Sequence, residues 1–183
     1  MFARLCLITC IFLVTACGNP GNPVNESQTY DYLTTFPKTG LSAGIKFNSP
    51  PKSKIDAPFT LRFWKTTGGN AQTGPFIDPG YPLVSSELQK PDEQDSIFLW
   101  MDSMGHGSKR VVSTRVVDGG GTFFKVSNVI FSMLGPWQIK LQLHQFQTDA
   151  AGKRMVVFAI DPVDAKRKAV IVESAQFEHD QKP

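Results

Sequence analysis

The sequence predicts an all-β protein, an immunoglobulin-like antiparallel β-sandwich of seven to nine strands. Short runs of β-branched and aromatic residues recur along the chain, and Gly, Pro, Asn and Asp separate them. No window shows a sustained helical period with caps at its ends. The 183 residues include 14 Phe but only 19% charged residues, which argues against a coiled coil, a helical bundle and general disorder. A closed barrel is the alternative fold, because periodicity does not separate the two.

The N-terminal residues have the features of a secretory signal. Residues 1–16 combine a basic start at Arg4, a short apolar run and small residues at the end. The apolar run is too short to span a bilayer. The sequence VTAC at residues 14–17 resembles the bacterial lipobox, in which the Cys becomes the lipidated first residue of the mature protein. We therefore expect a signal peptide over residues 1–16 and lipid on Cys17, with an ordinary signal peptide as the alternative.

Lipidation would also limit the chemistry of the mature chain. Cys6 and Cys10 would leave with the signal, so no thiolate nucleophile, Cys-based zinc site or redox pair is expected. Acyl chains would hold the protein to the membrane. Gly18 after the Cys favours the outer membrane in a Gram-negative cell, whereas a Gram-positive cell would keep the protein on the outer face of the plasma membrane. The net charge of +3 is too small to imply a nucleic-acid partner.

The mature chain divides into a tether, a domain and a short tail. Residues 17–40 are rich in Gly, Asn, Pro, Ser and Thr and predict a flexible tether, part of which Tyr30, Tyr32 and Phe36 would dock onto the domain. Residues 41–178 form the predicted sandwich, and residues 179–183 a polar tail with a solvated His179. The predicted strands cover residues 41–47, 58–65, 81–88, 96–101, 110–117, 122–131, 136–146, 154–160 and 169–177. The sequence DGGG at residues 118–121 predicts a hairpin.

One segment, WMDSMGHGS at residues 100–108, carries side chains with distinctive chemistry. Met101, Met104 and His106 place two thioethers and one imidazole close together, and this combination suits Cu(I). In a flat strand Met101 would point away from the other two, so a three-ligand site needs a turn, which Gly105 and Gly107 would permit.

Other candidates and a structural alternative accompany this metal hypothesis. His144 and Met133 are the best candidates for further ligands from elsewhere in the chain. In the structural alternative, Met101 and Met104 fill gaps in the core, and His106 organises the turn through a hydrogen bond. Large aromatic residues in predicted strands, such as Trp64 and Trp137, are expected to be structural.

A longer pattern follows the same segment. It reads MxxMGHGS at residues 101–108, RVV at 110–112, GGG at 119–121, Phe123, VxFxM at 129–133 and GxW at 135–137. This pattern resembles the YtkA-like/FixH-like family of extracytoplasmic domains over residues 41–143, most specifically over 100–143. The resemblance implies a small immunoglobulin-like domain, often lipid- or membrane-anchored, and some members are linked to copper supply or metal efflux. It also implies that Met101, Met104 and His106 are motif residues and that Gly135 and Trp137 are structural.

Two functions from different classes follow. The first is a non-enzymatic envelope lipoprotein that binds Cu(I) at the motif and passes it to a membrane partner. The second is a metal-free module that holds another envelope protein, with residues 59–65 as one candidate surface. An outward-facing Trp64 in an apolar patch would favour the second, and a buried Trp64 would count against it. An enzyme is not expected, since the sequence has no Gly-x-Ser-x-Gly elbow, His-Glu-x-x-His motif, phosphate-binding loop or dinucleotide fingerprint.

Overall fold

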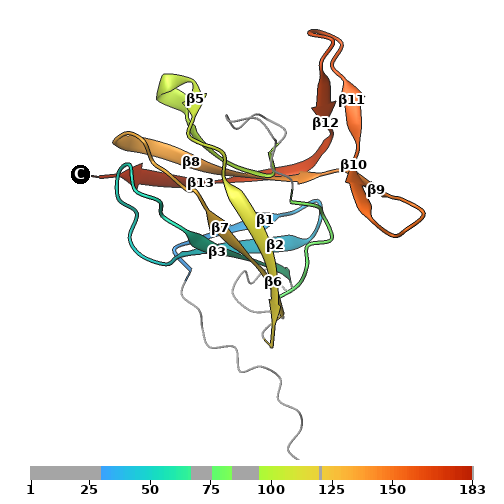
Figure 1. Ribbon diagram of the computed structural model, residues 1–183, viewed down its shortest axis with the longest axis horizontal. Helices are drawn as coiled ribbons and strands as arrows, with labels where there is room; N and C mark the ends of the chain where they lie inside the picture. Colours follow the sequence, from blue (N-terminus) through green and yellow to red (C-terminus); the bar gives the residue numbers. More distant parts are fainter. Residues whose placement is uncertain (1–29, 67–75, 84–94, 120, 183) are drawn as a thin grey trace, which may run out of the picture.

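The protein is an all-β molecule in which two antiparallel sheets pack face to face (Figure 1). The computed structural model describes residues 30–66, 76–83, 95–119 and 121–182. The predicted signal peptide, Cys17 and the first part of the predicted tether lie outside these residues. Within the described ranges, no helix has the length and apolar character needed to cross a membrane.

Nine strands make up the two sheets. The first sheet has the order β1-β2-β3-β7-β6, and the second has the order β13-β8-β4-β5. The strands of the first sheet are β1 (Tyr32–Phe36), β2 (Leu41–Phe47), β3 (Phe59–Lys65), β6 (Val112–Asp118) and β7 (Gly121–Ser127). Those of the second are β4 (Ile97–Met101), β5 (His106–Gly107), β8 (Gly135–His144) and β13 (Ile171–Gln181). Every neighbouring pair in both sheets is antiparallel.

The strand order is that of the immunoglobulin fold. With β2, β3, β6 and β7 taken as strands A, B, D and E, the first sheet reads A-B-E-D, and β1 is an additional strand beside A. With β4, β8 and β13 taken as C, F and G, the second sheet reads G-F-C, and β5 occupies the position of C′. The prediction of an immunoglobulin-like antiparallel sandwich is confirmed.

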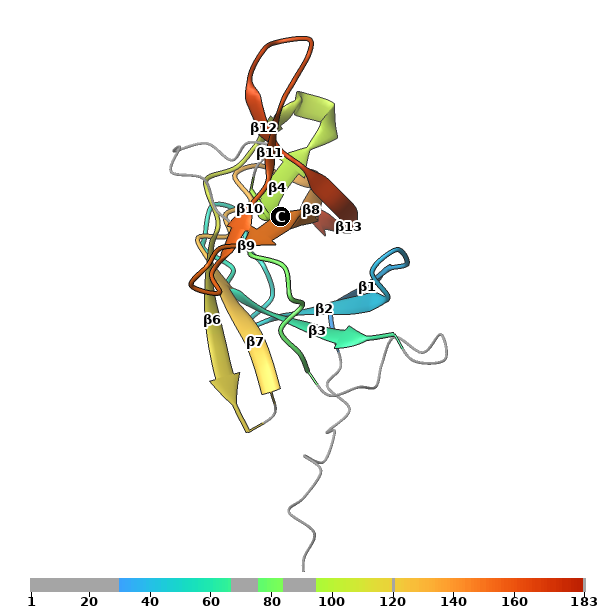
Figure 2. The same ribbon diagram turned by 90° about the vertical axis from the view of Figure 1, so that its right-hand side faces the viewer.

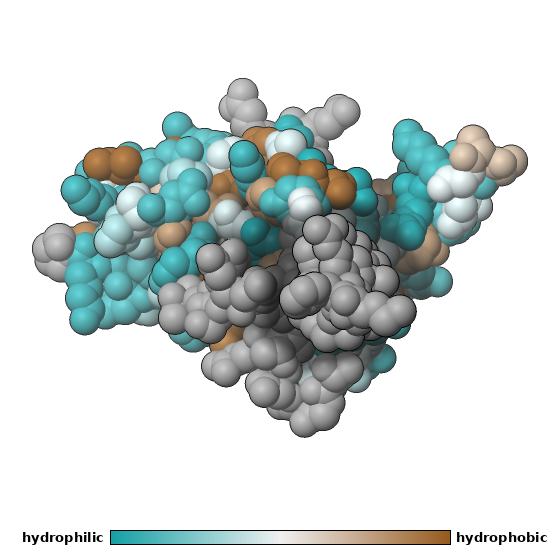
Figure 3. Space-filling view, turned by 90° about the horizontal axis from the view of Figure 1, so that it is seen from below, coloured by the Kyte–Doolittle hydropathy of each residue, from teal (hydrophilic) through white to brown (hydrophobic). Residues whose placement is uncertain are grey.

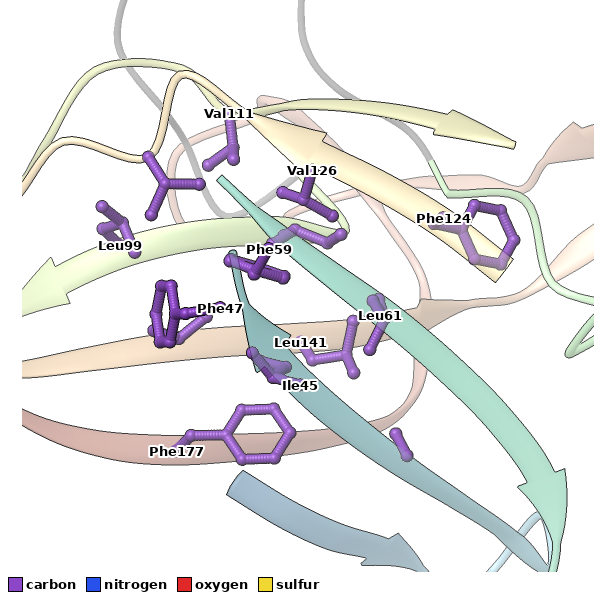
Figure 4. Close-up of a cluster of buried hydrophobic side chains, with 14 of the residues drawn as sticks. Ile45, Phe47, Phe59, Leu61, Leu99, Val111, Phe124, Val126, Leu141 and Phe177 are labelled. Carbon is purple, nitrogen blue, oxygen red and sulfur yellow. The ribbon is translucent and has the colours of Figure 1, made fainter. Parts of the chain in front are cut away.

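The core lies between the inner faces of the two sheets. Alternate residues of β3 (Phe59, Leu61 and Phe63) and of β8 (Trp137 to Leu143) are buried there, as the period of a strand requires. Figure 4 shows Leu61 and Leu141 in one cluster with side chains from β2, β4, β7 and β13. Trp137 is fully buried, and its Nε1 donates to the carbonyl oxygen of Met133 at 3.0 Å.

The sandwich begins earlier than residue 41, where the sequence placed the end of a tether. Tyr32 and Phe36 point inward on alternate residues of β1, and all of β1 pairs with β2, from Tyr32 opposite Ile45 to Phe36 opposite Leu41. The turn between these strands is fixed to the other sheet, because the carboxylate of Glu173 accepts from the amides of Lys38 and Thr39, each at 2.9 Å. The predicted tether was therefore too long at its domain end.

The sandwich also extends further toward the C-terminus than predicted. β13 continues to Gln181, and His179 is partly buried instead of solvated. The His179 ring lies 4.4 Å from the Phe131 ring, measured between centroids. Its Nε2 lies 3.2 Å from Oε1 of Gln181, which only accepts, so Nε2 carries the hydrogen. The Tyr32 hydroxyl then donates to Nδ1 at 2.8 Å. The charged residues next to His179 in the sequence had suggested a solvated position.

The first sheet splits where β3 and β7 diverge. Their pairing stops at Arg62 and Phe123, and Figure 2 shows the β6–β7 hairpin leaving the plane of β2 and β3. Phe76 and Ile77 fill the gap: the Ile77 amide donates to the Phe63 carbonyl at 2.8 Å, and the Thr122 amide donates to the Phe76 carbonyl at 3.4 Å. Residues 81–83, in the predicted strand 81–88, form no strand, and residues 84–88 lie outside the described residues.

Two hairpins replace the simple connection between β8 and β13. The first consists of β9 (Phe146–Thr148) and β10 (Arg154–Val156), and the second of β11 (Phe158–Ile160) and β12 (Arg167–Ala169). They meet the β8–β13 pair at a three-way junction of the connecting residues Gln145, Val157 and Val170. Each amide there donates to the next carbonyl: Gln145 to Val170 at 2.7 Å, Val170 to Val157 at 2.9 Å and Val157 to Gln145 at 2.8 Å.

We predict that Gly121→Ala lowers the free energy of unfolding by at least about 2 kcal/mol. The φ of Gly121 is +112°, and a Cβ built there lies 2.3 Å from the Phe76 carbonyl oxygen. Gly119→Ala is the control, since a Cβ at Gly119 meets nothing within 4 Å. Urea denaturation of both variants measures the difference. Equal stabilities would show that the Phe76 contact does not constrain the sheet.

Candidate functional site

The predicted motif forms a tight turn at one end of the second sheet, here called the Met–His turn (residues 101–107). After β4, residues Asp102–Met104 make one 3-10 turn, and Gly105 follows in the left-handed region with φ 61° and ψ 28°. The chain then returns as β5, with Met101 opposite His106 and Trp100 opposite Gly107. Gly105 suits this geometry, because residues with a Cβ rarely adopt a positive φ.

The turn separates the three predicted ligands by burial. Met101 is 3% exposed and belongs to the hydrophobic core, in agreement with its position on the inner face of β4. Met104 is 57% exposed, and His106 is also exposed. The structure therefore presents one thioether and one imidazole at the surface, while the second thioether faces the interior.

The hydrogen bond of His106 fixes which ring nitrogen is free. Nδ1 lies 2.9 Å from the Gly107 carbonyl oxygen, which can only accept, so Nδ1 carries the hydrogen. In the neutral ring Nε2 then holds a lone pair. Histidines that bind metals in proteins commonly donate their other ring N–H to a backbone carbonyl in this way.

Polar contacts that the sequence did not reveal brace the Met–His turn. Gln138 on β8 donates through Nε2 to Oδ2 of Asp102 at 2.8 Å and to Oε1 of Glu178 on β13 at 3.3 Å. Just beyond the turn, the Ser108 amide donates to the Leu99 carbonyl at 3.3 Å, and its hydroxyl donates to the Ile130 carbonyl. The alternation of apolar and polar residues in β8 predicts that Gln138 faces solvent. Its contact with Asp102 depends on the tertiary fold and could not be predicted from the sequence.

Met133 lies at the same end of the sandwich as the Met–His turn. It is partly buried against the core, three residues after Ile130, to which Ser108 binds. It also precedes Gly135, the first residue of β8, whose φ is +111°. A third thioether therefore lies at the end of the molecule that carries Met104 and His106.

His144 lies at the other end of β8 and does not belong to this group. Trp100 pairs with Gln138, and β8 runs away from the Met–His turn for six further residues, about 20 Å, before it reaches His144. His144 is completely buried, and its Nδ1 lies 3.2 Å from Oγ of Ser96. Since that hydroxyl donates to the Pro82 carbonyl at 3.3 Å, Nδ1 is the donor to Ser96. The structure thus gives His144 a place in the sandwich interior and separates it from the predicted ligands.

The described ranges contain no group of three or more His, Cys, Asp or Glu residues placed to hold a metal ion. The donor set of the Met–His turn is of a different kind, because it depends on thioethers. No protein-family model matches the chain, and neither curated proteins nor solved structures provide a similar one. The geometry of the chain's own residues is therefore the basis for a functional proposal.

We predict that His144 makes the stability of the fold depend on pH. Burial lowers the pKa of His144 below its usual 6.5. When the pH falls below that value, the unfolded chain binds a proton that the folded chain excludes, so the free energy of unfolding decreases. Urea denaturation at about pH 7.5 and about pH 5.5 should show a smaller decrease for His144→Gln than for the wild type. An unchanged decrease in that variant would contradict the assignment, and the exposed His106→Gln is the control.

Proposed function

We propose that this chain is a non-enzymatic envelope lipoprotein that binds Cu(I) at the Met–His turn. Met104 and His106 are the exposed ligands in this proposal. The other two thioethers at this end of the sandwich are Met101, which faces the core, and Met133, which is partly buried. Cu(I) is a soft ion that favours thioether and imidazole donors. The mature chain would offer no thiol to compete for the ion, because the only cysteines are Cys6, Cys10 and Cys17.

The orientation of His106 is the observation that carries this proposal. Its Nδ1–H is already occupied by the Gly107 carbonyl at 2.9 Å, so Nε2 remains for a ligand. Met104, two residues away on the same turn, is exposed and flexible enough to bring its sulfur toward that nitrogen. The Asp102–Gln138 and Ser108–Ile130 bonds hold both ends of the turn, which lowers the conformational entropy lost on binding.

A site made of surface ligands suits delivery of an ion better than its storage. A Cu(I) ion held by Met104 and His106 would keep an open side, on which ligands of a second protein could bind before the first two dissociate. The lipobox-like sequence ending at Cys17 supports a position at the membrane, where a recipient membrane protein would be within reach. The resemblance to the YtkA-like/FixH-like family, which includes members linked to copper supply, supports the same function.

We predict that Met104→Leu and His106→Gln each weaken Cu(I) binding about tenfold or more. Leu keeps the volume of Met but removes the sulfur, and Gln removes the imidazole. Competition with a colorimetric Cu(I) chelator under reducing conditions measures the affinity. Met155→Leu is the matched control, because Met155 is also exposed, at 40%, but lies on β10.

Met101→Leu and Met133→Leu then test whether the other two thioethers contribute, with thermal denaturation as a check that each variant is folded. Binding that survives the combined substitution of Met104 and His106 would exclude the proposed site. Absence of Cu(I) binding by the folded wild type would leave the Met–His turn with a purely structural role.

The second candidate function, a docking module for another envelope protein, is favoured by a different surface. Trp64 is only 1% exposed, which counts against residues 59–65 as the docking surface. The β11–β12 hairpin instead presents Val163, 93% exposed, at its tip. Asp161 orders that tip, since Oδ1 accepts from the Val163 amide at 2.7 Å and Oδ2 pairs with Lys168 at 2.9 Å. Ile160 on the same hairpin is 68% exposed, and exposed apolar residues that group together mark contact sites.

A photocrosslinking amino acid at position 163 tests this second candidate in intact cells. Position 151 is the control, because Ala151 is exposed at the tip of the neighbouring β9–β10 hairpin, which stands out at the right of Figure 3. A docking module should give a discrete adduct from position 163 and none from position 151. Equal adducts, or none from either position, would contradict it.

A further inference from the structure

A second polar cluster lies on the outer face of the first sheet, away from the Met–His turn. Phe59, Leu61 and Phe63 of β3 face the core, so Arg62 and Trp64 point to the opposite face. The residues across from Arg62 on the neighbouring strands are Gly44 of β2 and Phe123 of β7. Gly44 makes room for Tyr30, since a Cβ at Gly44 would lie 2.5 Å from the Tyr30 ring.

Aromatic rings enclose the Arg62 guanidinium. Its Cζ lies 4.3 Å from the centroid of the Phe76 ring and 4.6 Å from that of Phe123. The Tyr30 ring stacks on Trp64 with centroids 5.4 Å apart, and Trp64 contacts Phe76 edge to face at 6.3 Å. These five residues, Tyr30, Arg62, Trp64, Phe76 and Phe123, are called the Arg62 cluster below.

The Arg62 cluster holds an unusual set of unpaired donors. Nε and Nη1 of Arg62, Nε1 of Trp64 and the hydroxyl of Tyr30 are all buried, and none has a hydrogen-bond partner among the described residues. Buried polar atoms in folded proteins are nearly always bonded, and an unsatisfied one costs stability. Arg62 also makes no ion pair with any residue in the described part of the chain. The cluster therefore has one positive charge and several donors, and the described ranges place no anionic group against them.

We infer that the Arg62 cluster is a binding site for a carboxylate carried on an apolar body. The carboxylate accepts hydrogen bonds from Arg62, Trp64 and Tyr30, and the apolar body packs against the Phe76 and Phe123 rings. This inference is independent of copper binding, because the Met–His turn lies on the other sheet and shares no residue with the Arg62 cluster.

The composition of the cluster selects this ligand class. The positive charge of the Arg62 guanidinium excludes a cationic ligand. The same charge also acts on Tyr30: burial raises the pKa of Tyr30 to about 12, and the Arg62 charge opposes that rise. For a strongly hydrated dianion such as phosphate, the free energy of desolvation is larger than the attraction that one guanidinium between aromatic rings provides. A monocarboxylate needs one counter-charge, and its apolar part gains from the aromatic walls.

Ligand binding requires the cluster to open, because the four donor atoms are covered in this structure. Tyr30 lies just before β1, and no hydrogen bond holds its hydroxyl. A ligand that separates Tyr30 from Trp64 changes the surroundings of that indole. The fluorescence difference between the wild type and Trp64→Phe therefore reports directly on the site.

Thermal unfolding of the purified full-length chain tests the inference, with sodium benzoate and sodium acetate as the probes. Sodium sulfate and sodium chloride at the same ionic strength are the comparison salts. We expect a saturable rise of about 3–6 °C in Tm with benzoate and a smaller rise with acetate. The other salts should change Tm only as far as ionic strength alone does. Arg62→Met should abolish the response to benzoate, whereas Arg115→Met, which removes an exposed Arg paired with Asp78, should retain it.

Tyr30→Phe and Trp64→Phe remove one donor each with little change of shape, so they decide the question if Arg62→Met fails to fold. Each should raise the benzoate concentration at half-saturation several-fold. A wild type without a saturable benzoate response, or an undiminished response in the folded variants, would overturn the site. An equal response to sulfate or chloride would overturn the ligand class.

Discussion

The packing of β3 against β8 is the contact on which the rest of the molecule depends. These are strands B and F of the immunoglobulin order, the two strands that a disulfide joins in antibody domains. The described residues contain no cysteine, so apolar contact between residues such as Leu61 and Leu141 has to hold the sheets together. The long rows of buried Phe, Leu and Ile on these strands reflect this requirement.

Because this contact occupies the inner faces, the distinctive polar chemistry lies on the outer faces and at the sheet ends. Arg62 and Trp64 are on β3 itself, each next to a core residue and pointing to the opposite face. Gln138 is next to the core residue Trp137 on β8 in the same way. The Met–His turn forms where β4 runs past the core, which explains why Met101 is inside while Met104 and His106 are outside. The two proposed sites therefore use opposite sides of one scaffold.

Alternation in the sequence was sufficient to predict most strands and the fold class. It failed where a residue's burial depends on distant parts of the chain. Trp64 lies on an outer face and is nevertheless buried, because Tyr30 and Phe76 cover it. β1 and the last residues of β13 were missed, because Tyr32 and His179 lie among Asn, Thr and charged residues in the sequence. Only the tertiary fold brings these two side chains together across the sandwich, where they share a hydrogen bond. For the candidate site, spacing identified the turn, but the inward direction of Met101 and the remote position of His144 follow from register.

The three-way junction of Gln145, Val157 and Val170 has a consequence for how the chain tolerates change. Each of these residues uses both its amide and its carbonyl within the ring of three bonds, so three ladders end there without an unsatisfied group. Either hairpin can then be lengthened, shortened or exchanged beyond the junction while the sandwich keeps its own pairing. The junction is a natural grafting point, at which new recognition loops can be introduced between strands F and G without rebuilding the core.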